Sequence, residues 1–408
     1  MTKKYKTSLL VGGVNSPVRA GISVNADRFI ASKAQGPFLF DQSGTPFLDY
    51  ICGFGPILLG HQHPSIQATI ADTKAFSALG VCNEFEEPLA HLIQKANPTI
   101  EKVRMTNSGG EAVNAAIRIA KAATKRTQII KFSGQYHGAV ESVLGYVMPS
   151  QSIDTGIDPN VSEQLSCLTF NDIAQLESAF KIAPPAAVII EVISGNMGFI
   201  RAEPAFIQKL QQLCKTHQTM LIVDEVMTGF RVHPKGACAL YDLVPDLITY
   251  GKIIGGGLPV GAVAGPTRLM DLLSPIGPVY QAGTFSGHPL AMACGVTTLN
   301  TVFETPLIES CHQYLTVLAR ELIDLFKQKG MPFCIDYQGG QFGFYFQAHY
   351  PKSFQDIEPE SITLFTQFYH HMRKHHILLP PSHLEALFIT GAHDDQCLEM
   401  TIEAARDF

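Results

Sequence analysis

The middle of the chain alternates short apolar runs with helical stretches, and this alternation limits the possible folds more than any other feature. Four runs rich in β-branched residues are short enough to be buried strands, at 128–132, 186–193, 220–226 and 247–250. Helical patterns lie between several of them, notably at 111–125 and 204–217. Alternating strands and helices predict an α/β fold, with a mostly parallel sheet covered on both faces.

The two ends of the chain follow a different pattern. Near the front, PFLFDQSGTPFLDY predicts a hairpin that turns at Ser43 and Gly44. From residue 291 the pattern is helical to 329, strand-like in GGQFGFYFQ, and helical again over 361–376. This second texture predicts a separate, smaller α+β domain, with a boundary near residue 290.

Composition excludes several classes of protein. Of 408 residues, 46% are hydrophobic and 16% are charged, which predicts a folded globular protein. The net charge is −6 with no basic block, so we expect no nucleic-acid partner. The chain shows no secretory signal and no apolar run of roughly 18 residues, so we expect no membrane association and a cytoplasmic location.

Cysteine and histidine patterns do not indicate a metal site. The nine cysteines include no C-x-x-C pair, which argues against both a disulfide framework and a zinc site. His370, His371, His375 and His376 have a helical spacing, but no acidic base accompanies them as in H-E-x-x-H. We interpret them as a solvated helix face and expect no metal.

The segment TNSGGEAVNAAIRIAKAA is the first candidate for a binding site. A strand ends near Asn107, and Ser108, Gly109 and Gly110 lead into a helix that Glu111 opens. Such a turn can present backbone N–H groups and the positive end of the helix dipole to a phosphate. The alternative interpretation is an ordinary capped helix start.

Two further segments place ionisable residues at strand ends. MLIVDEVMTGFR delivers Asp224 and Glu225 where an apolar strand finishes, although such an aspartate could also cap a helix or bind a metal. In ITYGKIIGGGLPVGAVAG, Lys252 precedes the glycines at 255–257, the reverse of the P-loop order. An amine in an uncharged neighbourhood can serve as a Schiff-base lysine, whereas alone it would be an ordinary exposed lysine.

Together these segments make the chain resemble the class III, fold-type I pyridoxal-phosphate enzymes. The resemblance implies that Lys252 binds the cofactor aldehyde and Asp224 pairs with the pyridine nitrogen, keeping the ring an electron sink. Tyr136 in GQYHGA and Val226 would cover the two ring faces. The implied cofactor site comprises Ser108, Gly109, Gly110, Tyr136, His137, Asn196, Asp224, Val226, Lys252 and Thr284.

The same resemblance implies an assembly and a division into domains. Thr284 in QAGTFSGHPLAMACG would contact the cofactor phosphate of a neighbouring subunit, so we expect a homodimer. We expect an N-terminal segment over 1–50 that joins the small domain and the substrate site. A large cofactor-binding domain would follow over 51–290, and a small α+β domain over 291–408.

Within this superfamily the chain is most similar to the glutamate-1-semialdehyde 2,1-aminomutase family, from GGVNSPVRA at the front to IEAARDF at the end. Ser16 and Arg19 fall on substrate-binding positions of the front motif, and a guanidinium fork suits a carboxylate. Asn196 lies in the matching GNMG and Glu385 in the matching S-x-x-E-A segment. The implied reaction converts glutamate 1-semialdehyde to 5-aminolevulinate with no second substrate.

Several positions depart from that family pattern. Gly110 replaces a threonine, Phe54 a tryptophan, and Val192 a proline, and YHGAVESVL replaces a YHGHAD-type segment. Residues 145–165 lack the Gly/Ser-rich run of the family's mobile gate. A class III aminotransferase that uses a separate keto acid is therefore the alternative. A catalytically weak regulatory or storage homologue is a third, although it would not need both Asp224 and Lys252.

Overall fold

A computed structural model describes residues 8–74, 77–145 and 155–408. Within these ranges the main sheet has seven strands in the order β4-β12-β11-β10-β7-β5-β6. Their bounds are β4 Lys102–Thr106, β5 Ile129–Phe132, β6 Leu165–Leu168, β7 Ala187–Ile190, β10 Met220–Asp224, β11 Leu247–Gly251 and β12 Gly261–Gly265. Only β12 runs antiparallel to its neighbours, β4 and β11. The predicted mostly parallel sheet is confirmed.

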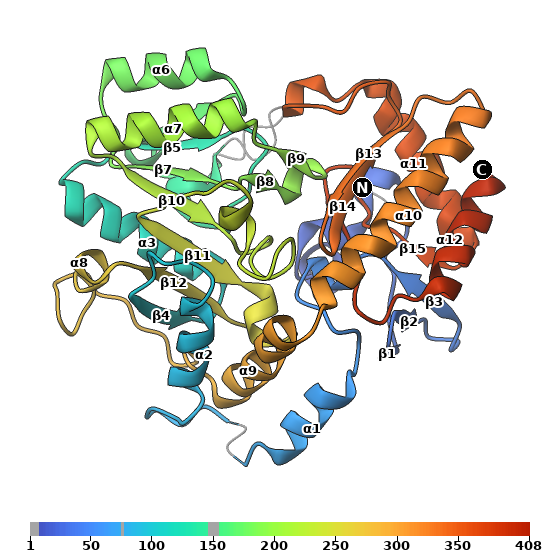
Figure 1. The fold of residues 1–408 in the computed structure, drawn as a ribbon, viewed down its shortest axis with the longest axis horizontal. Coiled ribbons are helices and arrows are strands. Elements are labelled where there is room, and N and C mark those ends of the chain that lie inside the picture. The colour runs from blue at the N-terminus through green and yellow to red at the C-terminus, as the bar shows by residue number, and fades with distance from the viewer. Residues whose placement is uncertain (1–7, 75–76, 146–154) are drawn as a thin grey trace.

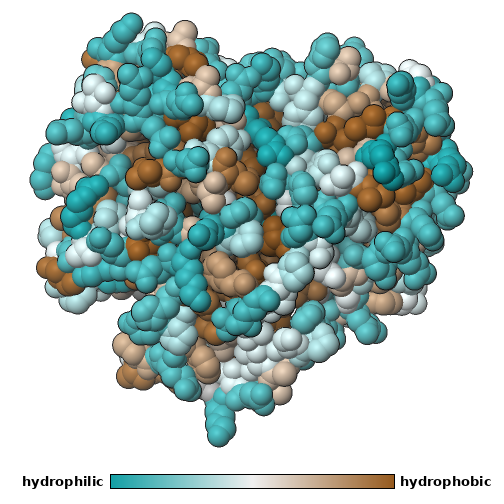
Figure 2. Space-filling model, viewed as in Figure 1, coloured by the Kyte–Doolittle hydropathy of each residue, from teal (hydrophilic) through white to brown (hydrophobic). Residues whose placement is uncertain are grey.

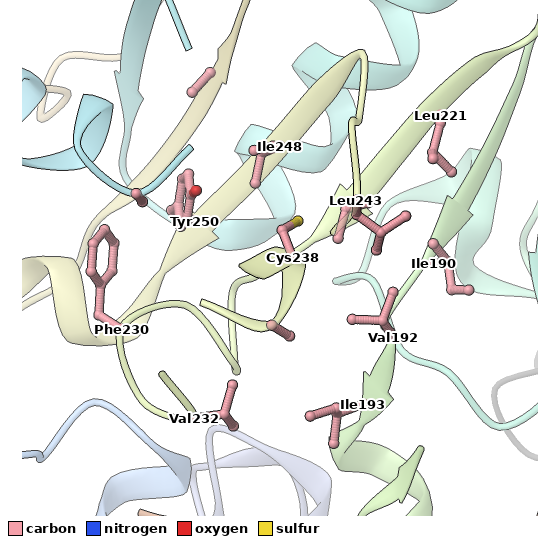
Figure 3. Packing of buried hydrophobic residues seen from close by; sticks show 14 of the residues in the cluster. Ile190, Val192, Ile193, Leu221, Phe230, Val232, Cys238, Leu243, Ile248 and Tyr250 are labelled. Carbon is pink, nitrogen blue, oxygen red and sulfur yellow. The ribbon is translucent and has the colours of Figure 1, made fainter. Parts of the chain in front are cut away.

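Helices cover both faces of this sheet (Figure 1). They are α3 (Gly109–Thr124) on one face, and α6 (Ile173–Ile182) and α7 (Pro204–His217) on the other. Successive side chains of a strand point to opposite faces, so Ile189 and Ile222 pack in the cluster with α3. Ile190 and Leu221 pack in the cluster on the other face, where Figure 3 labels them. Burial on both faces explains why the strands read as continuous apolar runs.

A second unit combines the two ends of the chain. The predicted hairpin is present as β2 (Phe38–Phe40) and β3 (Pro46–Asp49), and β3 pairs in parallel with the C-terminal β15 (Ile377–Leu378). The other elements are β1 Lys33–Gln35, β13 Cys334–Gln338, β14 Gln341–Tyr345, β16 Leu387–Phe388, α10 Leu307–Gln328, α11 Pro359–Lys374 and α12 Asp395–Arg406. They form the part of Figure 1 that contains both labelled ends of the chain.

The two units are joined through α9 (Pro289–Glu304). Its side chains Met292 and Leu299 pack in the core of the main sheet, and the helix lies against α1 (Pro64–Asp72) and α2 (Glu86–Gln94). In the next helix, α10, Ile308 still packs in the core of the main sheet, and the buried residues from Cys311 onward pack in the other core. The packing partners therefore change in the first turn of α10. The domain boundaries themselves stay predictions.

Shorter elements complete the described chain. They are β8 Ile193–Ser194, β9 Ile200–Arg201, α4 Glu141–Leu144, α5 Pro159–Ser162 and α8 Thr267–Met270. The altered segment at 145–165 lies partly outside the described residues, because its stretch 146–154 is not described. No described helix is long and apolar enough to cross a bilayer. Figure 2 shows a mostly hydrophilic face with scattered hydrophobic patches.

The interpretation of the four histidines as a solvated helix face is wrong for two of them. The Nε2 atoms of His370 and His371 lie 2.7 Å from the carbonyl oxygens of Val24 and Ala404. These contacts connect α11 to two distant parts of the chain. A helical pattern alone does not show that backbone carbonyls face the ring nitrogens.

Candidate active site

A cavity of about 510 Å³ opens beyond the carboxyl ends of the parallel strands, where open α/β sheets place their ligands. Its wall segments follow β4, β5, β7, β10 and β11 in turn. The predicted cofactor residues that line it are Ser108, Gly109, Gly110, Tyr136, His137, Asn196, Asp224, Val226 and Lys252. The fold thus gathers residues that are separated by more than a hundred positions in the chain.

Asp224 ends β10 and is almost fully buried, with a set of hydrogen bonds that fixes its carboxylate. Its Oδ1 atom accepts from the Val226 backbone N–H at 3.0 Å and from the Thr249 hydroxyl at 2.9 Å. Its Oδ2 atom lies 2.8 Å from His137 Nδ1. Burial lowers the pKa of His137, and the neighbouring Asp224 opposes that shift. These partners orient the carboxylate into the cavity wall as a hydrogen-bond acceptor.

Lys252 follows β11 with a φ of 50°, a left-handed conformation that is unusual for a residue with a side chain. It lines the cavity, and burial lowers the pKa of its amine. Nearby carboxylates act in the opposite direction. The glycines after it are required by the turn, because Gly256 has a φ of 59° and its Cβ would lie 2.6 Å from Cys294 O. A lysine with a lowered pKa can supply the neutral amine that attacks a carbonyl.

The start of α3 forms the third wall. Ser108 caps the helix, with its hydroxyl accepting from the Glu111 backbone N–H at 3.2 Å. A Cβ on Gly109 would lie 2.7 Å from a Val226 methyl, so only glycine lets this turn approach the end of β10. A Cβ on Gly110 would meet Gly138 at 3.5 Å, an ordinary contact. The departure from the family at Gly110 therefore does not result from a lack of space.

Two glutamates lie near the amine of Lys252. Glu191 follows β7, and its carboxylate accepts from the backbone N–H groups of Tyr136 at 3.3 Å and Gly195 at 3.2 Å. Burial raises the pKa of Glu191 to about 8. Burial also raises the pKa of Glu385 to about 7, which the charge of Lys252 partly opposes. Both acids therefore titrate near neutral pH, where they can exchange protons.

Four predicted site residues do not line this cavity, namely Ser16, Arg19, Thr284 and Glu385. Glu385 nevertheless contacts Asn196, which does line it. Ser16 lines a separate pocket of about 360 Å³ near the N-terminus, and Arg19 is exposed in the short helix Pro17–Ala20. Thr284 is exposed in the loop before α9. None of these residues lines the cavity within one chain, and their proposed roles stay predictions.

Other residues of the site did not stand out in the sequence. Glu191 follows an apolar run just as Asp224 does, so its position after a strand was an available signal. Thr249 and Met227 carried no such signal, because a threonine within a strand and a methionine after one are both common.

A family model for class III aminotransferases matches residues 22–405. The chain belongs to the class III aminotransferases. An omega-transaminase from Sphaerobacter thermophilus is 26% identical with a TM-score of 0.91, over 99% of this chain and 95% of that one. A β-phenylalanine aminotransferase from Variovorax paradoxus is 26% identical with a TM-score of 0.87, over 98% and 90%. The predicted fold-type I architecture is confirmed.

The fold is also similar to that of a glutamate-1-semialdehyde aminomutase from Pseudomonas aeruginosa PAO1. That structure is 21% identical with a TM-score of 0.83, over 93% of this chain and 87% of that one. At this identity the likeness concerns the fold.

Class III aminotransferases use pyridoxal 5'-phosphate, and the cavity of this member fits that cofactor. The glycine turn at the start of α3 would cradle the phosphate, and Asp224 would face the ring nitrogen. In the described chain, the buried Nε2 of His137 and Oδ1 of Asn107 have no hydrogen-bond partner. Such buried polar atoms are expected where a ligand or water completes the site.

Proposed function

We propose that this class III aminotransferase is an aminomutase, which converts glutamate 1-semialdehyde to 5-aminolevulinate. The contact between Asn196 and Glu385 carries the proposal. These residues come from the two mutase-like segments GNMG and S-x-x-E-A, and Asn196 Nδ2 lies 3.4 Å from Glu385 Oε1. The charges of Glu385 and Lys252 also influence each other. Two distant mutase-like segments thus meet beside the proposed catalytic amine.

The cofactor, when bound, supplies an electron sink for charge that develops at the substrate carbon. Asp224 maintains this property, because its fixed carboxylate favours a protonated ring nitrogen. Lys252 would act as the proton carrier at the reacting carbon, since burial lowers the pKa of its amine. Tyr136 and Val226 would cover the two faces of the cofactor ring, Asn196 would contact the cofactor, and Glu385 would contact the substrate.

An aminotransferase that passes the amino group to a separate keto acid is the second candidate. The ω-transaminase and the β-phenylalanine aminotransferase, each 26% identical over almost the whole chain, favour it. The exposed position of Arg19 also favours it, because a mutase is expected to grip the substrate carboxylate there.

One experiment separates these candidates. The purified enzyme, loaded with the pyridoxamine form of the cofactor, is given glutamate 1-semialdehyde without any keto acid. A mutase forms 5-aminolevulinate over many turnovers, whereas an aminotransferase stops after one equivalent until a partner substrate is added. Lys252→Ala serves as the control for non-enzymatic product. Failure to exceed one turnover would refute the mutase proposal.

A further inference from the structure

Arg231 is a fully buried cation without an acidic partner among the described residues. Its exposed fraction is 0%, and it lies between the core residues Phe230 and Val232, which Figure 3 labels. Its guanidinium carbon lies 5.1 Å from the centre of the Phe388 ring. Burial lowers the pKa of Arg231 to about 10, so the group stays positively charged at neutral pH. Burying a charge is unfavourable unless its hydrogen bonds are satisfied.

Backbone carbonyls satisfy this guanidinium from three separate segments. Its Nε and Nη2 atoms donate to Gly55 O at 3.2 and 2.7 Å, and Nη2 also donates to Ile57 O at 2.7 Å. Its Nη1 atom donates to Gly340 O at 3.1 Å and Ile389 O at 2.9 Å. The guanidinium group of Arg231 thus connects the loop after β10 to the bend at 52–57 and to the small unit.

The bend that Arg231 holds is strained. Residues 52–55 all have positive φ, including 46° at Cys52 and 62° at Phe54, which carry side chains. Such residues persist only where their surroundings enforce the conformation. On one side Asp49 Oδ1 accepts from the backbone N–H of Cys52 at 3.1 Å, and on the other Arg231 takes the Gly55 carbonyl.

This bend contacts the proposed catalytic lysine. A Cβ placed on Gly55 would lie 3.3 Å from Lys252 Cδ, so the backbone of the bend packs against the lysine side chain. Gly53 and Pro56, on either side, line the cavity. A movement of the Gly55 carbonyl would therefore change the space in which Lys252 moves.

The charge of Arg231 also reaches Lys252. Burial is the main cause that lowers the pKa of the Lys252 amine, and the positive charge of Arg231 acts in the same direction. Glu385, Glu191 and Asp224 act against it. The positive charge of Arg231 therefore acts against these three acidic groups and favours the neutral amine.

We propose that Arg231 is a positioning residue for Lys252. It holds the strained bend at 52–55 against the lysine side chain, and its permanent positive charge is fixed to that same bend. The inference rests on the proposed role of Lys252 as the amine that binds the cofactor.

The test compares Arg231→Met with Arg231→Lys in the cofactor-loaded enzyme. Arg231→Met removes both the positive charge and the guanidinium hydrogen bonds. Without the charge, the pH midpoint of the visible absorbance of the lysine-bound cofactor should rise. Without the hydrogen bonds to the bend, kcat should fall about 10²-fold. Arg231→Lys keeps a charge but loses the fork, so kcat should fall while the midpoint stays near that of the wild type. An unchanged midpoint in Arg231→Met, or a wild-type kcat in both variants, would overturn the proposal.

Arg126→Met is the matched control for loss of a carbonyl-bound arginine. Arg126 Nη1 donates to the carbonyls of Pro185 and His217 at 3.2 and 3.0 Å, far from the cavity. This variant should lose stability without a change in the absorbance midpoint or in kcat. A midpoint shift of the same size in Arg126→Met would overturn the proposal, because the effect would then not depend on the position of Arg231.

A second variant keeps the proposal testable if Arg231→Met does not fold. Gly55→Ala leaves Arg231 intact but places a methyl group 3.3 Å from Lys252 Cδ, at a φ of 110°. It should lower kcat at least about tenfold with little change in KM, because the lysine is displaced rather than the substrate site. A wild-type kcat in folded Gly55→Ala would overturn the positioning role.

Peptide mapping separates a failure of this inference from a failure of the proposed function. Borohydride reduction of the wild type should attach the cofactor to Lys252. Attachment to another lysine would refute the proposed function, and this inference with it. Attachment to Lys252 together with unchanged Arg231 variants would refute this inference alone.

Discussion

Asp224 and Lys252 meet in one cavity because the strands that carry them, β10 and β11, are parallel neighbours in the main sheet. Asp224 is opposite Thr249 in the pairing of these strands, which explains the hydrogen bond between the Thr249 hydroxyl and the Asp224 carboxylate. Lys252 lies just beyond the same end of β11. At the scale of single residues, the chemistry therefore depends on strand register and on burial, which shifts the pKa of the lysine.

Lys252→Ala should abolish covalent attachment of the cofactor while the fold is retained. The side chain lines the cavity, and no other lysine lines it among the described residues. Borohydride reduction followed by peptide mapping, with circular dichroism to monitor the fold, measures both parts. A lysine-bound absorbance band that persists in Lys252→Ala would contradict the assignment.

Asp224→Asn should keep the cofactor but lose activity by about 10²-fold or more, the scale for removal of one electrostatic stabiliser. A neutral amide cannot stabilise a protonated ring nitrogen, although it can occupy the same space. Steady-state kinetics of amino-group transfer measure the loss.

Asp246→Asn is a matched control, because Asp246 accepts from the Leu221 backbone N–H at the opposite end of the sheet. It should change stability but not kcat. Equal activity losses in the two variants would argue against a specific role for Asp224.

At the scale of elements, the short helix α4 depends on a buried lysine in β5. The ammonium group of Lys131 donates to Val143 O at 3.0 Å and Gly145 O at 2.9 Å, at the carboxyl end of α4. Its exposed fraction is 0%, and burial lowers its pKa to about 8. A cation at a helix C-terminus is stabilising, so Lys131 connects α4 to the sheet beside the cavity.

Lys131→Met should loosen this connection, and faster hydrogen exchange over 141–145 would report it. Between about pH 8 and 10.5 the unfolded chain binds a proton at Lys131 that the folded protein does not, because burial lowers the folded-state pKa. The free energy of unfolding of the wild type should therefore rise with pH over this window, relative to Lys131→Met. A constant difference between the two proteins would contradict the shift.

Lys121→Met provides the control for loss of a half-buried lysine. Lys121 donates to the Gln164 side chain from the exposed side of α3, so its removal should leave exchange in α4 unchanged.

In the molecule as a whole, polar contacts join the core of the small unit to the core on one face of the main sheet. The main sheet buries a separate apolar cluster on each of its faces, and the small unit has its own core, which is rich in phenylalanine around Phe326. The centre of the Phe326 ring lies 4.7 Å from the centre of the Phe333 ring and 5.3 Å from that of Phe346. Because Arg231 bonds to carbonyls on both sides, we expect the two cores to unfold together.

Phe326→Ala should lower the free energy of unfolding by about 3–5 kcal/mol, the usual cost of a cavity left by a buried phenylalanine. Urea denaturation should show a single transition for both the wild type and the variant. Phe132→Ala is the matched change in the other core, where Phe132 packs 5.3 Å from Phe206. The coupling of the cores would be contradicted if unfolding showed two transitions, with Phe326→Ala shifting one of them and Phe132→Ala shifting the other.

Sequence patterns alone predicted four strands of the main sheet, two of its helices and the candidate chemistry, whereas β6 and β12 were not predicted. Apolar runs of β-branched residues predicted β5, β7, β10 and β11, because a strand buried on both faces is mostly apolar, although β5 also contains the buried Lys131. Asp224 and Lys252 lie at the ends of such runs. Their positions predicted site residues, because the carboxyl ends of the strands in a parallel sheet meet at one edge.

The residues that surround these groups could be identified only from the three-dimensional packing of the chain. Arg231 reads as one charged residue in a loop, and its burial depends on carbonyls more than a hundred residues away. Ser16 and Arg19 match a substrate-binding motif, yet neither lines the cavity within one chain. A local sequence pattern depends on residues that are neighbours in the chain. The burial of Arg231 and the environment of the cavity instead depend on segments that are distant in the chain and pack together.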